Sequence, residues 1–273
     1  MLKQRVITAV ILLALFLSAL FLLPTLGWAA LVIIIVMQGS LEWARLSKLT
    51  RMTVSVYVWL TLVVMLGIVW LDTHYPGQLE SSHLLIYGMS ALLWLIVVPL
   101  WLKARWQVRQ PLLMMLTGWT LLIPTGLAMM DLRMQNPWWL LGVMGLVWVA
   151  DTAAYFSGRK FGKYKLAPNI SPGKTWEGVF GALLGVTMYV LLIVWTNELF
   201  TNYIALSGML IASWGWVGLA VIGDLFESAI KRQAGVKDSG SLLPGHGGLL
   251  DRIDALTSTL PLAAMAILLL RLV

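Results

Sequence analysis

The residues best suited to chemistry gather in one short stretch, KDSGSLLPGHGGLLDRID, which spans residues 237–254. It holds one Lys, three Asp, one Arg and one His among four Gly and one Pro. Glycines allow unusual dihedrals and close approach of the backbone to a ligand. Cationic side chains bind phosphates, and carboxylates bind hard divalent cations. The composition of this stretch therefore indicates a loop that handles a phosphate-bearing ligand.

Carboxylates also occur within apolar segments, where they are costly. Asp151 lies in LVWVADTAAYF and Asp224 in VIGDLFES. A charged side chain at the centre of a membrane helix costs roughly 2.5–3.5 kcal/mol on insertion scales, so its default interpretation is functional. Asp251 and Asp254 open the last apolar segment, and we expect all four carboxylates at similar depth near one membrane surface. Such charges repel one another without a cation, and oxygen-only ligands indicate Mg²⁺ completed by substrate phosphates.

The spacing of the acids supports a shared site but leaves a simpler explanation open. Asp251 and Asp254 are three residues apart, as are Asp224 and Glu227, so each pair shares a face if its segment is helical. Acids at the start of a helix also suit the helix dipole, which would explain Asp251 and Asp254 without a ligand. The dipole does not explain Asp224, because that residue lies near the C-terminal end of its segment.

A second polar segment, GRKFGKYKLAPNISPGKTWEG, covers residues 158–178. Its GKT is not a P-loop, because Pro168 stands where the first glycine is required and a membrane helix precedes it. Lys174 nevertheless follows a Ser-Pro-Gly turn that begins at Ser171, and helix N-termini bind anions. We therefore expect Lys174 to contact a substrate phosphate. Attraction to anionic lipid is the preferred explanation for three neighbouring cations, Arg159, Lys160 and Lys163.

Membrane helices must position these residues. The chain has 273 residues, of which 60% are hydrophobic and 11% charged, which is typical of a polytopic membrane protein. About 20 apolar residues cross the hydrocarbon core. The sequence therefore predicts an all-α polytopic integral membrane protein of about nine transmembrane helices, at 6–23, 26–42, 54–71, 84–102, 112–130, 138–157, 177–196, 204–226 and 255–272. The second segment is the weakest, because Gln38 and Glu42 lie near its end.

Loop charge predicts the orientation, because cytoplasmic loops are enriched in Lys and Arg. If the N-terminus is cytoplasmic, all of the 19 basic residues except Arg133 and Arg271 fall on the cytoplasmic side. We therefore predict an N-in, C-out chain with the active site at the cytoplasmic face, on loops 158–176 and 227–254. Residues 1–130 form the N-terminal helices and 131–273 the catalytic region of one integrated membrane domain.

The composition also excludes several classes of function. There is no cysteine, and therefore no disulfide framework or thiolate chemistry, and three His without Cys disfavour a zinc site. Basic cytoplasmic loops explain the net charge of +7, so no nucleic-acid partner is expected. The first apolar run is long for a signal peptide and lacks a small-residue cleavage site, so we interpret it as an uncleaved first helix.

The order of the polar residues resembles that of a known family. The resemblance rests on SAIKR at 228–232, KDSG at 237–240 and LPGHGGLLDRID at 243–254. Together they are similar to the signature of the bacterial phosphatidate cytidylyltransferases, also called CDP-diacylglycerol synthases. SPGKTWEG at 171–178 and the aspartate of the sixth apolar segment resemble that family too. The motif-bearing resemblance covers about residues 148–256, whereas the first 130 residues match only as apolar segments.

The resemblance implies transfer of CMP from CTP to phosphatidate, giving CDP-diacylglycerol and pyrophosphate for phospholipid biosynthesis. It implies Mg²⁺ as cofactor, CTP, phosphatidate and membrane lipids as partners, and the bacterial cytoplasmic (inner) membrane as location. A phosphate monoester is already nucleophilic, so no general base is required, and the protein positions groups and neutralises charge. The resemblance leaves a second, monovalent cation and a homodimer open.

The resemblance also implies roles for individual residues. The catalytic residues are Asp224, Asp251, Lys174, Lys237 and Arg252. The metal ligands are Asp224 and Asp251, with Asp254 and Asp151 as auxiliary ligands. The substrate-binding residues are Ser171, Lys231, Arg232, Asp238, His246, Gly247 and Gly248.

Two alternatives remain at this point. Another CTP-dependent lipid transferase or a polyprenol kinase would lack the full GHGG-x-x-DR-x-D context. An ion-coupled membrane transporter would show inverted repeats and charges at the membrane midplane. Here the acids are expected at one face and no repeat is visible in the sequence.

Overall fold

The computed structural model describes residues 2–196, 202–242 and 247–272, and nearly all of them are helical. The helices are α1 (Leu2–Leu22), α2 (Thr25–Leu46), α3 (Arg51–His74), α4 (Glu80–Leu92), α5 (Val98–Ala104), α6 (Pro111–Gln135), α7 (Pro137–Phe161), α8 (Trp176–Thr196), α9 (Tyr203–Ala234) and α10 (Leu250–Leu272). A π-helical turn, η1 (Leu93–Val97), joins α4 to α5, so Glu80–Ala104 is one continuous helical segment. The irregular turn falls just before Pro99, which has no N–H to donate.

Within the described residues, eight of these segments are long and apolar enough to cross a membrane. They are Thr25–Leu46, Arg51–His74, Glu80–Ala104, Pro111–Gln135, Pro137–Phe161, Trp176–Thr196, Tyr203–Ala234 and Leu250–Arg271. The described apolar part of α1, Ile7–Leu22, is shorter. These helices lie where the sequence places its apolar segments, which confirms the prediction of an all-α polytopic membrane protein.

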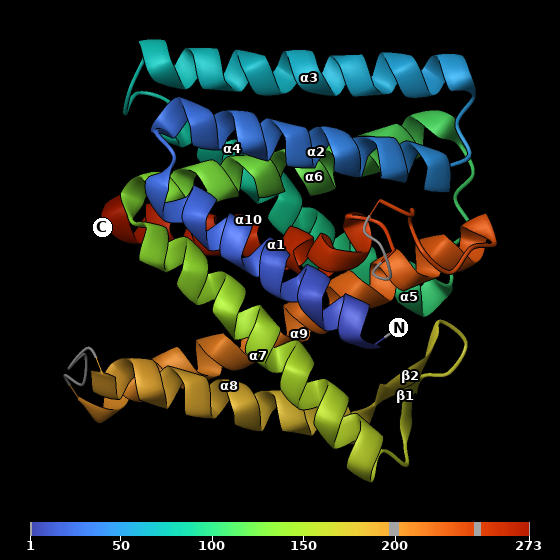
Figure 1. Cartoon of the computed structure of the whole chain (residues 1–273), viewed down its shortest axis with the longest axis vertical. Helices are drawn as coiled ribbons and strands as arrows, with labels where there is room; N and C mark the ends of the chain where they lie inside the picture. The colour runs from blue at the N-terminus through green and yellow to red at the C-terminus, as the bar shows by residue number, and fades with distance from the viewer. Residues whose placement is uncertain (1, 197–201, 243–246, 273) are drawn as a thin grey trace.

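The helices run side by side, with α10 at the centre and α3 at one margin (Figure 1). In α10, 61% of the most apolar stretch is buried inside the protein, against 17% in α3. The weakest predicted span, α2, forms a full helix whose Trp43 donates to Met114 O of α6 at 2.7 Å. On the opposite side, α7, α8 and α9 form a separate layer held by small side chains, namely Ala150, Ala182, Val186 and Val217.

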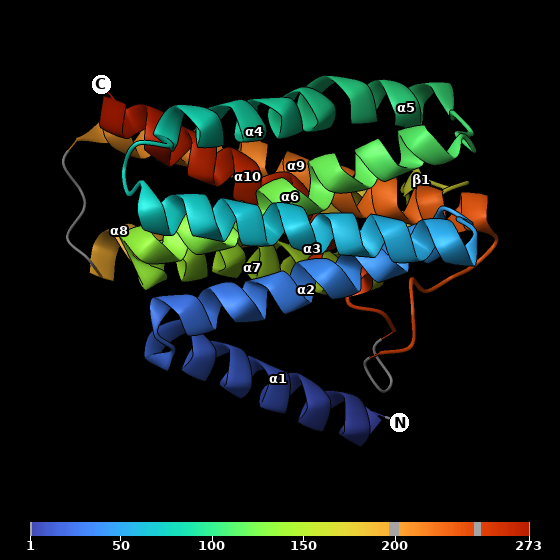
Figure 2. The same ribbon diagram turned by 90° about the horizontal axis from the view of Figure 1, so that it is seen from above.

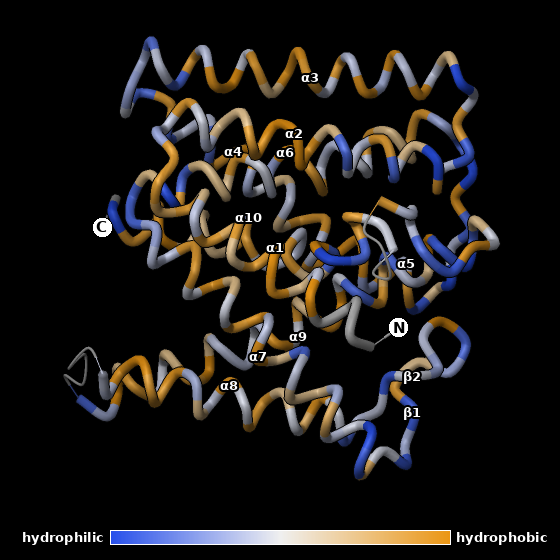
Figure 3. Tube along the Cα trace, viewed as in Figure 1, coloured by the Kyte–Doolittle hydropathy of each residue, from blue (hydrophilic) through white to orange (hydrophobic). Residues whose placement is uncertain are grey.

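The two termini lie at opposite ends of the helix bundle (Figures 1 and 2). The N-terminus shares its end with the segment between α7 and α8 and with the segment between α9 and α10. Much of the hydrophilic chain gathers at this end (Figure 3). Arg133, one of the two basic residues outside the charge rule, lies at the other end. Its Nε donates to Leu20 O at 2.8 Å and its guanidinium lies over the Trp28 ring, so it caps the end of α1.

Both polar connections are shorter than the predicted loops 158–176 and 227–254. Helix α7 continues to Phe161, α9 to Ala234, and α10 begins at Leu250. Apolarity marks only the part of a helix inside the hydrocarbon core, whereas helical hydrogen bonding continues until a cap ends it. Gly235 supplies that cap for α9 with a left-handed φ of 77°. The α7–α8 connection holds the one β-sheet among the described residues, an antiparallel hairpin of β1 (Lys165–Ala167) and β2 (Ser171–Thr175).

Candidate functional site

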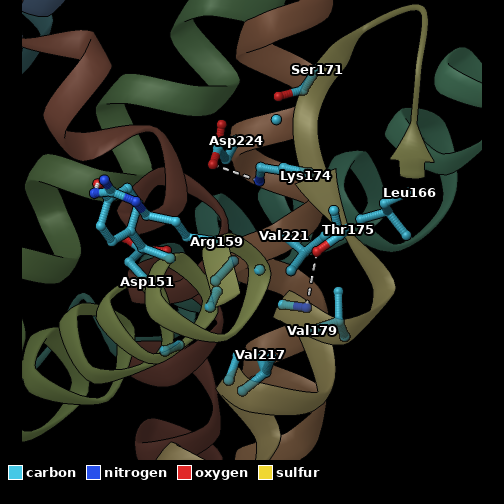
Figure 4. Close-up of a pocket in the computed structure, with 18 of the residues that line it drawn as sticks. Asp151, Arg159, Leu166, Ser171, Lys174, Thr175, Val179, Val217, Val221 and Asp224 are labelled. Carbon is cyan, nitrogen blue, oxygen red and sulfur yellow. Dashed lines mark hydrogen bonds and ion pairs between the residues drawn. The ribbon is translucent and has the colours of Figure 1, made fainter. Parts of the chain in front are cut away.

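A cavity of about 560 Å³ opens between α7, α8, α9 and the hairpin. One part of its lining is charged or polar and the other part is built from small apolar side chains (Figure 4). The polar residues are Asp151, Arg159, Lys165, Ser171, Lys174, Thr175 and Asp224. The apolar residues include Ala150, Ala182, Val217, Ala220 and Val221. The cavity therefore suits a ligand that has both an ionic group and an apolar part.

Lys174 reaches across this cavity from β2 to α9. Its Nζ lies 2.5 Å from Asp224 Oδ2, and both side chains are partly exposed (Figure 4). The sequence predicts Lys174 in a turn at a helix start, but it lies in a strand, two residues before α8 begins. Thr175 Oγ1 accepts Gly178 N at 3.2 Å, which ties the strand to the first turn of α8. The hairpin thus holds the Lys174 ammonium over the cavity.

The four predicted carboxylates divide into two environments. Asp151 of α7 and Asp224 of α9 line the cavity. Asp254 of α10 lies beside Gly223, the neighbour of Asp224 in the chain, since a Cβ at Gly223 would lie 2.8 Å from Asp254 O. Asp251 is held instead by the α9–α10 connection, as described below. Among the described residues, no three Asp, Glu or His side chains lie close enough together to hold a metal ion by themselves.

Asp251 uses both of its oxygens in contacts with the protein. Its Oδ1 lies 2.5 Å from Lys231 Nζ, and its Oδ2 accepts Ser239 N at 2.9 Å and Gly248 N at 2.8 Å. Lys231 Nζ also lies 2.6 Å from Glu227 Oε2. The Lys231 ammonium therefore sits between two carboxylates on α9 and α10, and Asp251 closes the loop that joins these helices.

The remaining predicted residues lie around this framework. Lys237 and Asp238 are exposed in the α9–α10 connection, and Ser171 lines the cavity. Arg232 is exposed, and its Nε donates to Ile170 O at the hairpin tip at 3.4 Å. Arg252 is exposed in the first turn of α10. His246 lies outside the described residues.

The glycines of the connection are constrained by the protein itself. Gly247 has a left-handed φ of 86°, and a Cβ there would lie 2.7 Å from Asp251 Oδ2. A Cβ at Gly248 would clash with Ser239 Oγ and with Glu42 Oε2. Both positions therefore require glycine for packing, before any ligand is considered.

The sequence analysis missed Lys165 and Thr175 of the cavity lining, and it missed Glu42, which contacts the α9–α10 connection. Glu42 lies on α2, is completely buried, and its Oε1 accepts Leu249 N at 2.9 Å. The sequence marks it only as a weakness of the second apolar segment. The rule that singles out Asp151, a carboxylate inside an apolar run, applies equally to Glu42 and would have found it.

The donor set of the cavity fits Mg²⁺ by its chemistry. Asp151 and Asp224 offer only oxygen ligands, next to the cations Lys174 and Arg159. Magnesium is usually bound through one or two carboxylates and completed by water and substrate phosphates. The residues therefore fit a metal ion that arrives with a phosphate-bearing substrate rather than one held in a closed protein cage.

Comparisons with known proteins agree along nearly the whole chain. The sequence profile of the Cytidylyltransferase family matches residues 3–270. A Haemophilus influenzae protein named phosphatidate cytidylyltransferase is 39% identical over 279 residues, which cover 96% of each chain. Proteins of the same name are 39% identical in Pseudomonas aeruginosa, over 97% of this chain and 96% of the relative, and 34% identical in Brucella suis, over 94% and 90%. The similarity therefore includes the N-terminal helices as well as the motif-bearing region.

Proposed function

The chain belongs to the cytidylyltransferase family, and from this premise we propose that it transfers CMP from CTP to phosphatidate, giving CDP-diacylglycerol and pyrophosphate for phospholipid biosynthesis. The observation that carries the proposal is the cavity in which Lys174 meets Asp224 beside an apolar wall. A lipid phosphate and a nucleotide triphosphate both need cations, and the lipid also needs an apolar surface. This cavity offers both in one place.

The proposal includes an orientation. The chain crosses the bacterial cytoplasmic membrane nine times, with α1 as the first crossing, the N-terminus inside and the C-terminus outside. Termini at opposite ends of the bundle support an odd number of crossings (Figures 1 and 2). The hairpin and the α9–α10 connection then face the cytoplasm, where CTP is dissolved, while phosphatidate enters from the bilayer.

In the reaction, an oxygen of the phosphatidate phosphate attacks the α-phosphorus of CTP. The bond from the α-phosphorus to the oxygen that bridges to the β-phosphate breaks, and pyrophosphate leaves. A phosphate monoester is nucleophilic without a general base, so the protein contributes position and charge. Lys174 holds a phosphate at the centre of the cavity, with Ser171 beside it. Lys237 and Arg252 neutralise the charge of the leaving group.

The acidic residues hold the cation that accompanies the phosphates. Asp224 and Asp151 line the cavity, and Asp254 completes the proposed ligand set from α10. Asp251, whose oxygens contact Lys231, Ser239 and Gly248 in this structure, joins the set when substrate phosphates draw Lys231 away. When bound, Mg²⁺ neutralises charge on the phosphate oxygens. Lys231 keeps Glu227 and Asp251 together across α9 and α10. Lys231 and Arg232, in the last turn of α9, bind substrate phosphates, while Asp238, His246, Gly247 and Gly248 of the α9–α10 connection form the proposed CTP-binding loop.

The test is an assay on membranes that contain the protein, supplied with labelled CTP, phosphatidate and Mg²⁺. We expect labelled CDP-diacylglycerol that depends on phosphatidate and on the metal. The main assay uses CTP labelled in its cytidine moiety, which follows the transferred CMP. A parallel reaction with γ-phosphate-labelled CTP and a polyprenol in place of phosphatidate distinguishes the kinase alternative, because a kinase transfers the γ-phosphate. Label in the polyprenol product, or no lipid product from either substrate, would contradict the proposed function. Lys174→Gln membranes serve as the control for endogenous enzyme.

A further inference from the structure

Glu42 is the one charged side chain of α2 that lies completely buried. It comes from the N-terminal helices, to which the reaction assigns no role. Its carboxylate accepts four hydrogen bonds. Oε1 accepts Gln38 Nε2 at 2.8 Å and Leu249 N at 2.9 Å, and Oε2 accepts Ser239 Oγ at 2.8 Å and Leu250 N at 2.9 Å. Three of these four donors belong to the connection between α9 and α10 or to the first residue of α10.

From these contacts we propose that Glu42 is a positioning residue for CTP, because it holds residues 239–240 and 248–250 in the shape that the nucleotide requires. The proposal rests on the function proposed above. Glu42 touches no reacting atom. It acts through Ser239 and through the start of α10.

The backbone contacts explain why an acid is needed at this position. The first N–H groups of a helix have no partner within the helix. At α10 two donors, Leu249 N and Leu250 N, turn to Glu42, which therefore caps α10 from a different helix. Each contact uses the carboxylate as an acceptor, which is the property of its ionised form. An amide at this position would present an N–H₂ group to N–H donors and leave a buried donor without a partner.

The same contacts connect Glu42 to the charged centre of the site. Ser239 Oγ lies 2.8 Å from Glu42 Oε2 and 3.1 Å from Asp251 Oδ2. Asp251 in turn contacts Gly248 N and Lys231 Nζ. Glu42 and Asp251 therefore both hydrogen-bond to the connection. Asp251 also links it to α9 through its ion pair with Lys231. A shift of the connection would move Asp251 together with Lys237 and Arg252.

The glycines give a second, independent observation. A Cβ at Gly248 would clash with Glu42 Oε2, and a Cβ at Gly240 would lie 3.0 Å from Glu42 Oε1. The sequence interpretation assigns such glycines to close approach of the nucleotide. In the structure, the missing side chains of Gly240 and Gly248 leave room for the Glu42 carboxylate. The connection is therefore built around Glu42, over a separation of about 200 residues along the chain.

The main experiment compares Glu42→Gln with the wild type in purified, detergent-solubilised form. We expect KM for CTP to rise, and kcat/KM for CTP to fall on the order of 10²-fold, because a misplacement of about 1 Å costs that much at a reacting centre. KM for phosphatidate should stay within a factor of about 3 of the wild-type value, since the apolar wall of the cavity lies on α7, α8 and α9. Thermal stability is measured on the same preparations.

Asp131→Asn is the matched control. Asp131 is also a poorly exposed acid that accepts side-chain hydrogen bonds, from Tyr87 Oη and His83 Nδ1, but it lies at the other end of the bundle. We expect this variant to lose stability with an unchanged KM for CTP. If Glu42→Gln shows wild-type kinetics, or loses stability with the same unchanged KM, Glu42 is a structural residue and the inference is wrong.

Ser239→Ala keeps the inference testable if Glu42→Gln does not fold. It removes one donor to Glu42 and one to Asp251, and it leaves both carboxylates and their backbone contacts in place. We expect a several-fold rise in KM for CTP with stability close to wild type. An unchanged KM for CTP in Ser239→Ala would overturn the inference. A wild-type protein that makes no CDP-diacylglycerol would instead contradict the proposed function, so the two failures are distinguishable.

Discussion

The two ends of the helix bundle both contain acids beside a cationic or polar partner, but they are built differently. At the C-terminal end of the bundle, His83 lies 3.1 Å from Asp72 and 2.8 Å from Asp131, and Tyr87 donates to Asp131. This network joins α3, α4 and α6 beside a cavity of about 180 Å³. At the N-terminal end, Lys174 and Asp224 face a cavity of about 560 Å³.

The two ends differ in how far their charged groups remain accessible to a ligand. His83 has both ring nitrogens engaged with carboxylates, so the network at the C-terminal end is closed on itself. Lys174 and Asp224 are joined to each other, and 22% and 33% of their side chains remain exposed next to the apolar wall of the larger cavity. The corresponding exposed fractions are 12%, 22% and 12% for His83, Asp72 and Asp131. A cluster of charges therefore does not mark the site. The candidate site is the place where a partly exposed ion pair, which a ligand can reach, borders a cavity large enough to hold that ligand.

The largest expected effect concerns which end faces the cytoplasm. Cysteines introduced at the exposed Ser241 and Gln78 report the N-terminal and C-terminal ends of the bundle. With an N-in chain, an impermeant thiol reagent added to intact cells should label Gln78→Cys and leave Ser241→Cys unlabelled until the membrane is opened. The chain has no other cysteine, so the signal is all or none. The reverse labelling pattern would exchange the roles of the two ends.

The next effect concerns the ion pair between Lys174 and Asp224 at the cavity. Lys174→Gln should lower turnover by about 10²–10³-fold, since removing one donor that stabilises developing charge costs about 2.7–4 kcal/mol. Stability should change little, because the side chain is partly exposed. Lys160→Gln is the matched control. Lys160 is exposed, its ammonium lies over the Phe161 ring, and its loss should be mild. Equal, small effects from both variants would favour attraction to anionic lipid as the role of Lys174.

The glycines give a third, smaller effect. Gly248→Ala should lower stability by about 1–3 kcal/mol, because the new methyl group overpacks a filled site against Ser239 and Glu42. Gly173→Ala adds the same methyl group on the hairpin, where no atom lies within 4 Å, and should leave stability unchanged. Thermal unfolding of the two variants measures the difference. A Gly248→Ala protein as stable as Gly173→Ala would mean that the connection is not packed around Glu42.

The smallest effect belongs to the closed network. Asp131→Asn should cost on the order of 1 kcal/mol of stability, as hydrogen bonds between membrane helices do. Activity per folded molecule should stay at the wild-type level, because the network lines a separate cavity together with Leu268 and Arg271, near the C-terminal end of α10. The measurements are thermal unfolding and CDP-diacylglycerol formation on the same preparation. A large loss of turnover in this variant would show that the two ends are coupled, and the comparison would then fail.

Local patterns were enough to predict the membrane helices and to single out several residues that line the cavity. Runs of about 20 apolar residues mark the spans because the bilayer itself sets that length. Asp151 and Asp224 stand out because a carboxylate is costly in such a run. Lys174 was singled out by its neighbours in sequence, and the resemblance covers the stretch from Lys237 to Asp254. Each of these inferences depends on a residue and its immediate context, which the sequence contains in full.

Tertiary packing decided which of these residues meet. Lys174 contacts Asp224 because a hairpin, rather than a helical turn, extends from α8 toward α9. Glu42 meets Ser239 because α2 packs close to the start of α10, and no local pattern encodes a partner 197 residues away. The sequence by itself therefore determined which residues are costly or chemically able. Only the packing of the helices decided their partners, since an ion pair or a cap depends on distances that the chain sets only after it has folded.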